Sequence, residues 1–429
     1  MHIGIYINNE NISSVDCKNL LAGNPGIGGT EYCVLLLAQA YKMYYSNNKV
    51  TLFVAKQGVL PEVDNYVVVN GIDDLPAKAQ KEDVDVLVVS AVYNGIPLPQ
   101  SFFDDISAKK IKTILWGHNF YLNDFCNKIC KCEYAKANVF VGRQQYDRYI
   151  DHAVINKSTY IYNMYPETGE LHREKIQNHA VTYIGSLVPT KGFHVLAAAW
   201  KTILKEVPDA TLNVVGNGKL YGRNSKLGKY NIAEDSYEKQ FMSGLTDDEG
   251  NILPSVHFWG VLGVEKNDVI RNTCVGVVNP TGRTETFGIS ALDFESMSVP
   301  VVTIAKGGFL DTVLNEETGL LYGHTDDFAK DIIMLLKNDK LNEQYGRDGV
   351  HLCKKFTPDK IIKEWNRLFL KVLNDEKMEY IEPDSFMETN LKKYRCLNRK
   401  IKDAIGVEYP ISVIGAESFA RNVLRRMGK

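Results

Sequence analysis

The sequence predicts an α/β protein with two doubly wound domains and a C-terminal helical extension. Short runs rich in valine and isoleucine alternate with segments of helical periodicity, and this alternation is typical of parallel sheets. The runs form two series, separated by the polar segment 165–179, which contains a proline and a glycine. We therefore expect a first domain over residues 1–170, a second over 171–370 and the extension over 371–429.

The first domain is predicted to contain five strands, and its first strand begins at the start of the sequence. The runs are 2–7, 50–55, 84–91, 112–117 and 137–142. Between the first two, segment 30–45 carries apolar residues at helical spacing after a glycine-rich turn, which indicates a crossover helix. Because the runs are almost continuously apolar, we expect helices to cover both faces of the sheet.

The second domain repeats this pattern with five further runs. They are 181–186, 211–216, 256–260, 275–280 and 300–305. Doubly wound domains bind ligands at the carboxyl ends of their strands, so we expect the chemistry in a cleft between the domains. The connection 217–233 is longer than usual and carries several glycines and lysines, which favours a functional loop.

The composition excludes several classes of protein. With 50 Lys and Arg against 52 Asp and Glu, the net charge is −2, so nucleic acid is not an expected main partner. Eight cysteines are ordinary for a reducing compartment. No uninterrupted apolar stretch reaches the ~18 residues that cross a bilayer, and no basic leader precedes the first strand. We expect a cytoplasmic enzyme, which could act at the inner face of the membrane.

The extension has an uneven charge distribution. Residues 376–390 carry five acids against one base, whereas residues 391–429 carry ten bases against three acids. Two interpretations stay open. The segment is either a pair of solvated helices packed on the body of the protein, or a basic patch that meets an anionic lipid surface or acceptor.

The strongest motif lies at residues 281–302. If Gly288 opens a helix, Glu285 and Asp293, which are eight residues apart, fall near one helix face. Backbone N–H groups around Phe287 and Gly288 would then bind phosphates, and the carboxylates would accept hydrogen bonds from sugar or ribose hydroxyls. The alternative is an exposed acidic helix start that only complements the helix dipole.

This stretch resembles the EX7E region of glycosyl transferases group 1, a large family of retaining enzymes with the GT-B fold. The sequences GGF at 307–309 and TGLLY at 318–322 also match the family pattern. The resemblance implies two Rossmann-like domains that face a cleft, the first on the acceptor side and the second binding the nucleotide sugar. Asp293 stands where the family usually has glutamate, and Glu295 is out of register.

Segment 185–200 resembles the phosphate-binding turn of that family. Lys191 matches the family lysine, whereas Ser186 occupies the place of its arginine. A lysine aimed at the leaving nucleoside diphosphate stabilises the charge that develops as the glycosidic bond breaks. Either Arg283 replaces the missing cation, or one cation suffices. The alternative for Lys191 is a solvated lysine at a helix start.

The glycine-rich segment 23–32 precedes the first crossover helix. Gly28 and Gly29 would let the backbone approach a phosphate closely. A dinucleotide-binding fingerprint is excluded because about fifteen residues separate Ile7 from Gly23 and no GxGxxG is present. The sequence GGTE instead resembles the GGxE turn of the family, which faces the donor across the cleft.

His118 ends the run 112–117 at a carboxyl edge, where the family also carries a histidine. Its position suits a hydrogen bond to a sugar hydroxyl, and a structural histidine is the alternative. Cys126, Cys130 and Cys132 lack the second ligand pair of a zinc site. We therefore expect neither a metal ion nor a cofactor.

The resemblance implies a retaining, hexosyl-type glycosyltransferase that moves a sugar from a nucleotide sugar to a glycan or lipid-linked acceptor in envelope glycan or polysaccharide synthesis. Glu285, Lys191 and His118 are the expected catalytic residues. The expected donor-binding residues are Gly28, Gly29, Ser186, Lys191, Gly216, Val261, Glu285, Thr286, Phe287, Gly288 and Asp293. Lys191 would bind the diphosphate, the turn at Val261 the base, Asp293 the ribose and Glu285 the sugar. An epimerase or hydrolase on the same scaffold, or a nonenzymatic glycan-binding module, are the alternatives.

Overall fold

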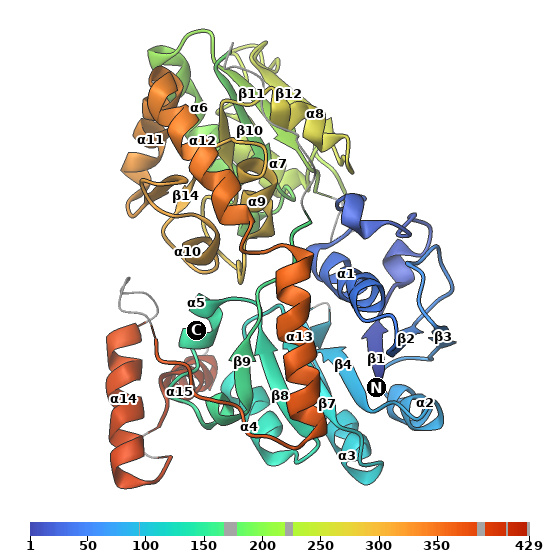
Figure 1. Cartoon of the computed structure of the whole chain (residues 1–429). Helices are drawn as coiled ribbons and strands as arrows, with labels where there is room; N and C mark the ends of the chain where they lie inside the picture. The colour runs from blue at the N-terminus through green and yellow to red at the C-terminus, as the bar shows by residue number, and fades with distance from the viewer. Residues whose placement is uncertain (94, 167–177, 219–225, 384–390, 409–410, 427–429) are drawn as a thin grey trace. The chain divides into compact units, whose positions relative to one another are not determined.

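The computed structural model describes residues 1–93, 95–166, 178–218, 226–383, 391–408 and 411–426 (Figure 1). The chain forms two compact units. The first contains Met1–Leu20, Thr30–Met164 and Pro358–Lys429, and the second contains Leu21–Gly29 and Tyr165–Thr357. Most of the expected linker 165–179 and part of the expected functional loop 217–233 lie outside the described residues.

The first unit is built on a seven-stranded parallel sheet of order β3-β2-β1-β4-β7-β8-β9. Its strands are β1 (His2–Ile7), β2 (Lys49–Val54), β3 (Asn65–Val68), β4 (Val86–Ser90), β7 (Thr113–Gly117), β8 (Ala135–Phe140) and β9 (Ser158–Tyr160). Strands β5 (Val92–Tyr93) and β6 (Ile96–Pro97) form a separate antiparallel pair. All five predicted runs are strands. The two unpredicted ones, β3 and β9, are short edge strands without a continuous apolar run.

Helices cover the first sheet. They are α1 (Gly29–Tyr44), α2 (Leu75–Lys81), α3 (Gln100–Ala108), α4 (Asn123–Lys131), α5 (Arg143–Asp147) and α13 (Pro358–Leu373), with the short 3-10 helices η1 (Glu10–Ile12), η2 (Leu20–Ala22) and η3 (Ala153–Lys157). The predicted crossover helix over 30–45 is α1. One cluster of buried apolar side chains joins the sheet to α2, α3 and α4.

Helix α13 belongs to the first unit, although the sequence placed it in the second domain. The Trp365 ring packs against Trp116 on β7 with centroids 4.7 Å apart, and Phe369 packs against Tyr41 on α1 at 5.0 Å. The Tyr41 hydroxyl also donates to the side chain of Asn366. The apolar periodicity of this segment predicted a packed helix, but it carried no information about which sheet the helix covers.

The second unit is built on a six-stranded parallel sheet of order β12-β11-β10-β13-β14-β15. Its strands are β10 (Ala180–Ile184), β11 (Thr211–Val215), β12 (Val256–Gly260), β13 (Val275–Val277), β14 (Val301–Ile304) and β15 (Gly319–Tyr322). Its helices are η4 (Pro189–Lys191), α6 (Phe193–Glu206), α7 (Asp235–Met242), α8 (Lys266–Arg271), α9 (Ile289–Glu295), α10 (Phe309–Thr312), α11 (Thr325–Lys337) and α12 (Asp339–Cys353). One apolar cluster joins the sheet to α6, α7 and α11, and a second joins it to α8, α9 and α10, so this domain is doubly wound.

Two helices, α14 (Lys392–Ile405) and α15 (Val413–Arg426), form the C-terminal extension. The predicted fold class, two Rossmann-like α/β domains followed by a helical extension, is confirmed. Of the acidic segment 376–390, the structure describes residues 376–383. Among all described helices, none combines the length and apolar character that a bilayer span requires.

Candidate active site

Glycines shape the carboxyl edge of the second sheet. Gly216 follows β11 with φ +133°, and a β-carbon placed on it would lie 2.0 Å from the carbonyl oxygen of Gly185, which follows β10. The Gly216 amide donates to the carbonyl of Gly260 at 2.7 Å. Because the backbones approach so closely, only glycine fits here. The expected donor residue Gly216 therefore lies at the edge where a ligand of this fold would bind.

Lys191 and Glu285 meet at this edge. Lys191 ends η4, and its carbonyl accepts a hydrogen bond from the Tyr183 hydroxyl at 2.8 Å. Gly192 then adopts a left-handed conformation and leads into α6. The Lys191 ammonium forms an ion pair with Glu285 Oε1, and the Glu285 side chain is only 12% exposed. The structure thus brings together two residues that the sequence singled out separately.

Asn279 holds the same carboxylate. It lies just beyond β13, and its side-chain amide donates to Glu285 Oε1 at 3.1 Å and to the Arg283 carbonyl at 2.9 Å. Its side-chain oxygen accepts from the Thr281 hydroxyl at 2.9 Å. Sequence reasoning missed Asn279. The Asn-Pro pair after the strand signals a turn, but it does not show which side chain the asparagine contacts.

The backbone after Glu285 is held by the loop between β14 and α10. The Gly308 amide donates to the Glu285 carbonyl at 3.2 Å, and a β-carbon on Gly307 would lie 2.5 Å from that oxygen. Thr286 and Phe287 are buried, and a β-carbon on Gly308 would lie 2.3 Å from the Phe287 amide nitrogen. Gly288 has φ +85° and precedes α9. Since α9 begins at Ile289, the expectation that Glu285 itself shares a helix face with Asp293 is wrong.

Asp293 lies on α9 and is held from two sides. Its Oδ2 pairs with the Lys266 ammonium at 2.8 Å, and its Oδ1 accepts from the Tyr165 hydroxyl at 3.2 Å. The Asp293 side chain is 14% exposed. Each of the two acidic residues of the motif therefore has a lysine partner. Lys266 and Tyr165 were not predicted, because both come from segments distant in sequence.

Glu295, the out-of-register acid, plays a different part. It is fully buried, and its Oε1 accepts from the Thr318 hydroxyl at 2.6 Å. Burial raises the pKa of its carboxyl well above the usual range. A buried acid of this kind belongs to the packing of α9 and is not available to a ligand.

Among the described residues, no single cation takes the place of the family arginine at Ser186. Ser186, which precedes Lys191 in the sequence, is buried, whereas Arg283 is exposed. Within the described parts of the chain, no carboxylate pairs with the Arg283 side chain. Burial lowers the pKa of His194, and the positive charge of Arg283 lowers it further. Lys306, also exposed, lies across Gly282, where a β-carbon would be 3.0 Å from the Lys306 β-carbon.

The glycine-rich loop before α1 rests on the turn after β12. Asn24 Oδ1 accepts from the amides of Gly26 and Ile27 at 2.9 Å, which closes the loop. A β-carbon on Gly26 would lie 3.6 Å from Val261, an exposed residue that we expected near the base. Gly28 and Gly29 end this loop, and no atom lies within 4 Å of a β-carbon placed on Gly29.

His118 belongs to the first unit, just after β7. Its ring packs against Trp116 with centroids 4.4 Å apart, and both ring nitrogens are buried. Burial lowers the pKa of His118 to about 3, although a side-chain hydrogen bond with Asn163 acts in the opposite direction. The imidazole is therefore neutral near pH 7, which suits hydrogen bonding and not proton donation as an imidazolium.

The three cysteines near His118 lie in or next to α4, where Cys126 and Cys132 are buried. Cys132 lies 3.3 Å from the Ser107 hydroxyl. In the described ranges, no group of three or more His, Cys, Asp or Glu side chains is arranged to hold a metal ion.

Residues 171–351 match the family model described as Glycosyl transferases group 1. Both acid–lysine pairs, Lys191–Glu285 and Lys266–Asp293, lie within this range, whereas Tyr165 precedes it. This part of the chain is a glycosyl transferases group 1 domain. The expected resemblance to glycosyl transferases group 1 is thereby confirmed for residues 171–351.

Curated proteins are similar to the chain over part of its length. An uncharacterized glycosyltransferase of Methanocaldococcus jannaschii is 26% identical over 215 residues, which is 50% of this chain and 53% of that protein. The capsular polysaccharide biosynthesis glycosyltransferase CapM of Staphylococcus aureus is 27% identical over 180 residues, 42% of each chain. The matched part thus spans about half the length of these curated relatives.

The fold of the chain is similar to that of solved structures. The crystal structure of Anabaena Alr3699/HepE in complex with UDP-glucose superposes with a TM-score of 0.63 and 16% identity, covering 86% of this chain and 100% of that chain. At this identity the likeness concerns the fold alone.

Proposed function

We propose that the protein is a retaining glycosyltransferase, which moves a hexosyl group from a nucleoside-diphosphate sugar to an acceptor hydroxyl. The observation that carries the proposal is the Lys191–Glu285 ion pair at the carboxyl edge of the second sheet. A cation beside a carboxylate offers the two groups that such a donor needs, one for its diphosphate and one for its sugar hydroxyls. The glycosyltransferase names of the relatives support the same reaction class.

In this proposal the domain of residues 171–351 binds the donor. The Lys191 ammonium turns from Glu285 toward the diphosphate and stabilises the negative charge that the leaving group gains. Glu285, still held by Asn279, accepts hydrogen bonds from the sugar hydroxyls. Asp293 accepts from the ribose, and the exposed turn at Val261 lies against the base. Lys306 and Arg283 are the exposed cations near the Glu285 turn that could add to the diphosphate contacts.

The chain supplies positioning for the transfer, and no protein carboxylate is assigned as a covalent nucleophile. The acceptor hydroxyl attacks the face of the sugar that the nucleotide leaves, so the configuration is retained. The departing phosphate takes the proton of the acceptor. Neutral His118 would orient a sugar hydroxyl by a hydrogen bond only once substrate binding opens one of its buried ring nitrogens to the acceptor. The acceptor is a glycan or a lipid-linked glycan, and the CapM relative supports a role in envelope polysaccharide synthesis.

Acceptor-dependent release of nucleoside diphosphate tests the proposal. The purified chain is first screened against nucleotide sugars by thermal shift, because a bound donor stabilises the native state. The stabilising donor is then incubated with glycan acceptors, and the product anomer is assigned by NMR. We expect release that depends on the acceptor and a product with the donor configuration. Interconversion of the donor without release would show an epimerase, and release without an acceptor would show a hydrolase.

A further inference from the structure

Helix α14 packs on the first unit through its basic face. Its buried bases recur at positions that lie on one helical face: Lys392, Arg395, Arg399 and Lys402. The apolar residues of the helix, which share another face, are exposed: Tyr394, Leu397, Ile401 and Ile405. A surface helix of a globular protein normally does the reverse and turns its apolar stripe toward the core.

Buried acids of the first unit hold the helix in this orientation. Lys392 pairs with Asp147 at 2.6 Å, and both side chains are buried. Arg395, 1% exposed, pairs with Asp151, which is 0% exposed, at 3.4 Å. The Lys402 ammonium donates to the Asp151 carbonyl at 2.7 Å. A rotation of α14 about its axis that buried its apolar face would leave these acids without their basic partners. Removing the partner of a buried charge is strongly destabilising, so this rotation is unfavourable.

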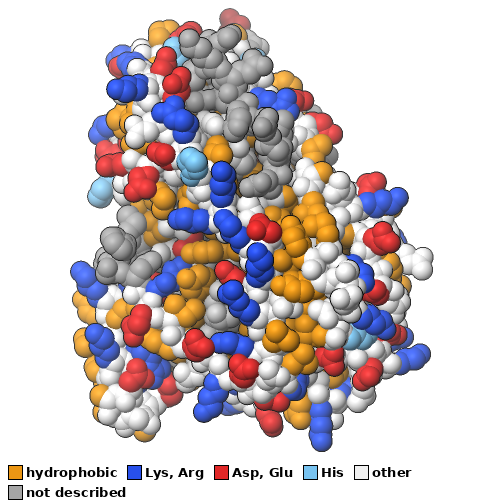
Figure 2. All heavy atoms as spheres, viewed as in Figure 1, with side chains coloured by type: hydrophobic (Ala, Val, Ile, Leu, Met, Phe, Trp, Pro, Cys, Tyr) orange, Lys and Arg blue, Asp and Glu red, His pale blue; other side chains and the backbone are white. Residues whose placement is uncertain are grey.

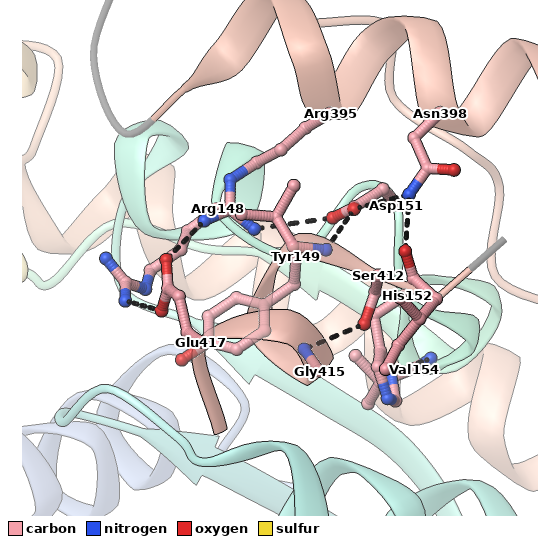
Figure 3. A network of polar contacts seen from close by, with 12 residues as sticks. Arg148, Tyr149, Asp151, His152, Val154, Arg395, Asn398, Ser412, Gly415 and Glu417 are labelled. Atoms are coloured by element: carbon pink, nitrogen blue, oxygen red, sulfur yellow. Dashed lines mark hydrogen bonds and ion pairs between the residues drawn. The ribbon is translucent and has the colours of Figure 1, made fainter. Parts of the chain in front are cut away.

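The second helix of the extension is fastened to the same acids. Figure 3 shows Arg395 and Asn398 of α14 reaching Asp151, and Glu417 of α15 between Arg395 and Arg148. The Val413 amide at the start of α15 also donates to Asp151 Oδ2 at 2.6 Å. Asp151 thus holds both helices in place. These contacts determine which face of α14 points toward solvent.

Both helices, and the residues that flank them, carry exposed apolar side chains. We call this set the apolar face of the extension, and it consists of Leu391, Tyr394, Leu397, Ile401, Ile405, Val407, Ile411, Phe419, Val423 and Leu424. Tyr394 is 65% exposed, Leu397 57% and Phe419 68%. Hydrophobic side chains are visible along the outer edge of α14 in Figure 2. An exposed apolar surface of this kind is typical of an interaction site.

The charges beside this face are cationic. Between residues 391 and 426, the three described acids all form ion pairs: Asp403 pairs with Arg399, Glu408 with Arg399 and Lys402, and Glu417 with Arg395 and Arg148. Lys400 on α14 and Arg425 on α15 are exposed. Lys400 and Arg425 therefore add exposed positive charge to the two helices, which complements an anionic surface.

We propose that the apolar face of the extension docks on an anionic lipid bilayer, with α14 and α15 lying in the interface. Exposed apolar side chains enter the boundary of headgroups and acyl chains, while the exposed Lys400 and Arg425 meet lipid phosphates. A second copy of the chain would instead bring the same cations against each other. The binding energy comes from apolar insertion more than from the basic charge counted in the sequence, because four of the ten bases are turned inward.

Vesicle co-sedimentation of the full chain tests this surface without any donor or acceptor. The vesicles contain phosphatidylcholine alone or phosphatidylcholine with phosphatidylglycerol. We expect binding to the anionic vesicles and a roughly tenfold or larger loss of affinity for the double variant Leu397→Asp/Ile401→Asp. The matched control is Met334→Asp, an exposed apolar residue on α11 of the other unit, which should bind like the wild type. Circular dichroism and the melting temperature check that all variants fold.

A charge variant and the oligomeric state complete the test. Lys400→Glu/Arg425→Glu should weaken binding to anionic vesicles, and added salt should weaken but not abolish wild-type binding. Equal binding of wild type and Leu397→Asp/Ile401→Asp would overturn the proposal. So would a wild-type dimer in light scattering that the double variant splits into monomers while neither binds vesicles, because a second copy would then cover the face.

Discussion

Asn279 donates a side-chain hydrogen bond to Glu285 Oε1, the same carboxylate oxygen that the Lys191 ammonium contacts. The asparagine side chain also donates to the Arg283 carbonyl and accepts from the Thr281 hydroxyl. It therefore fixes both the side chain and the turn of the proposed sugar-binding acid. When Lys191 turns to a diphosphate, Asn279 is the group that keeps Glu285 in place.

Replacing Asn279 with alanine should lower kcat/KM by about tenfold to a hundredfold, because a hydrogen bond to a charged group contributes about 1.5–3 kcal/mol. Asn279→Asp should be more severe, since it places a second carboxylate beside Glu285. Steady-state kinetics with varied donor measure both effects. Asn272→Ala, which removes an exposed asparagine bonded only to the Asp268 carbonyl, is the control. Unchanged kinetics of Asn279→Ala would remove its positioning role.

Removing Lys191 tests the proposed electrostatic role directly. Lys191→Ala should reduce kcat by about a hundredfold to a thousandfold, the range for a lost donor to developing negative charge. The fold should persist, because the ion pair lies at a partly exposed edge. Lys201→Ala, an exposed lysine on α6, should leave turnover unchanged. If Lys191→Ala turns over like the wild type, the proposed donor site is wrong.

Tyr165→Phe weakens the support of Asp293. The substitution removes the hydrogen bond to Asp293 Oδ1 and the 3.0 Å contact with the Ser296 hydroxyl, but leaves the ion pair of Asp293 Oδ2 with Lys266. We expect the KM for the donor to rise severalfold while kcat changes little, because the ribose does not take part in bond breaking. Lys266→Ala should raise this KM further. A fall in kcat at constant KM would contradict the assignment of Asp293 to the ribose.

The buried His118 side chain should make the free energy of unfolding depend on pH. Its pKa is about 3 in the folded chain, below its ordinary value of 6.5. Between these values the unfolded state binds more protons, so stability should fall as the pH drops from about 6.5 toward 3, by up to about 1.4 kcal/mol per pH unit from this group. His152, whose burial lowers its pKa to about 4, adds to the same slope. Urea unfolding of His118→Gln between pH 4 and 7 should show a shallower slope than the wild type. Parallel slopes would show that His118 is not buried as described.

The strands were predictable because their information is local. Continuous apolar runs marked β1, β2, β4, β7 and β8 and their counterparts β10 to β14. Edge strand β3 alternates half-buried and exposed residues, so it lacks that signal. Helix α13 showed its apolar face in the sequence, but only the packing of Trp365 on Trp116 assigns it to the first sheet.

The site was predictable only in part, for the same reason. Motif spacing indicated Lys191, Glu285 and Asp293, whereas Asn279 and Lys266 emerge from contacts that the fold creates. The helix periodicity of α14 was also readable, but its orientation was not. That orientation depends on Asp147 and Asp151, which lie more than 240 residues earlier in the chain.

Asp151→Ala should therefore be the most disruptive substitution in the extension contact. It removes one of the two carboxylates that pair with the buried Arg395 and an acceptor of both Asn398 and the Val413 amide, and breaking a buried ion pair costs about 3–5 kcal/mol. Limited proteolysis should cut within 391–426 much faster in this variant, and chemical unfolding should show the loss of stability. Asp403→Asn removes a carboxylate that is 63% exposed, while Arg399 keeps its pair with Glu408, so it should cost less than about 1 kcal/mol. Equal proteolysis of the two variants would show that Asp151 does not hold the extension, and the fixed outward direction of its apolar face would lose its physical basis.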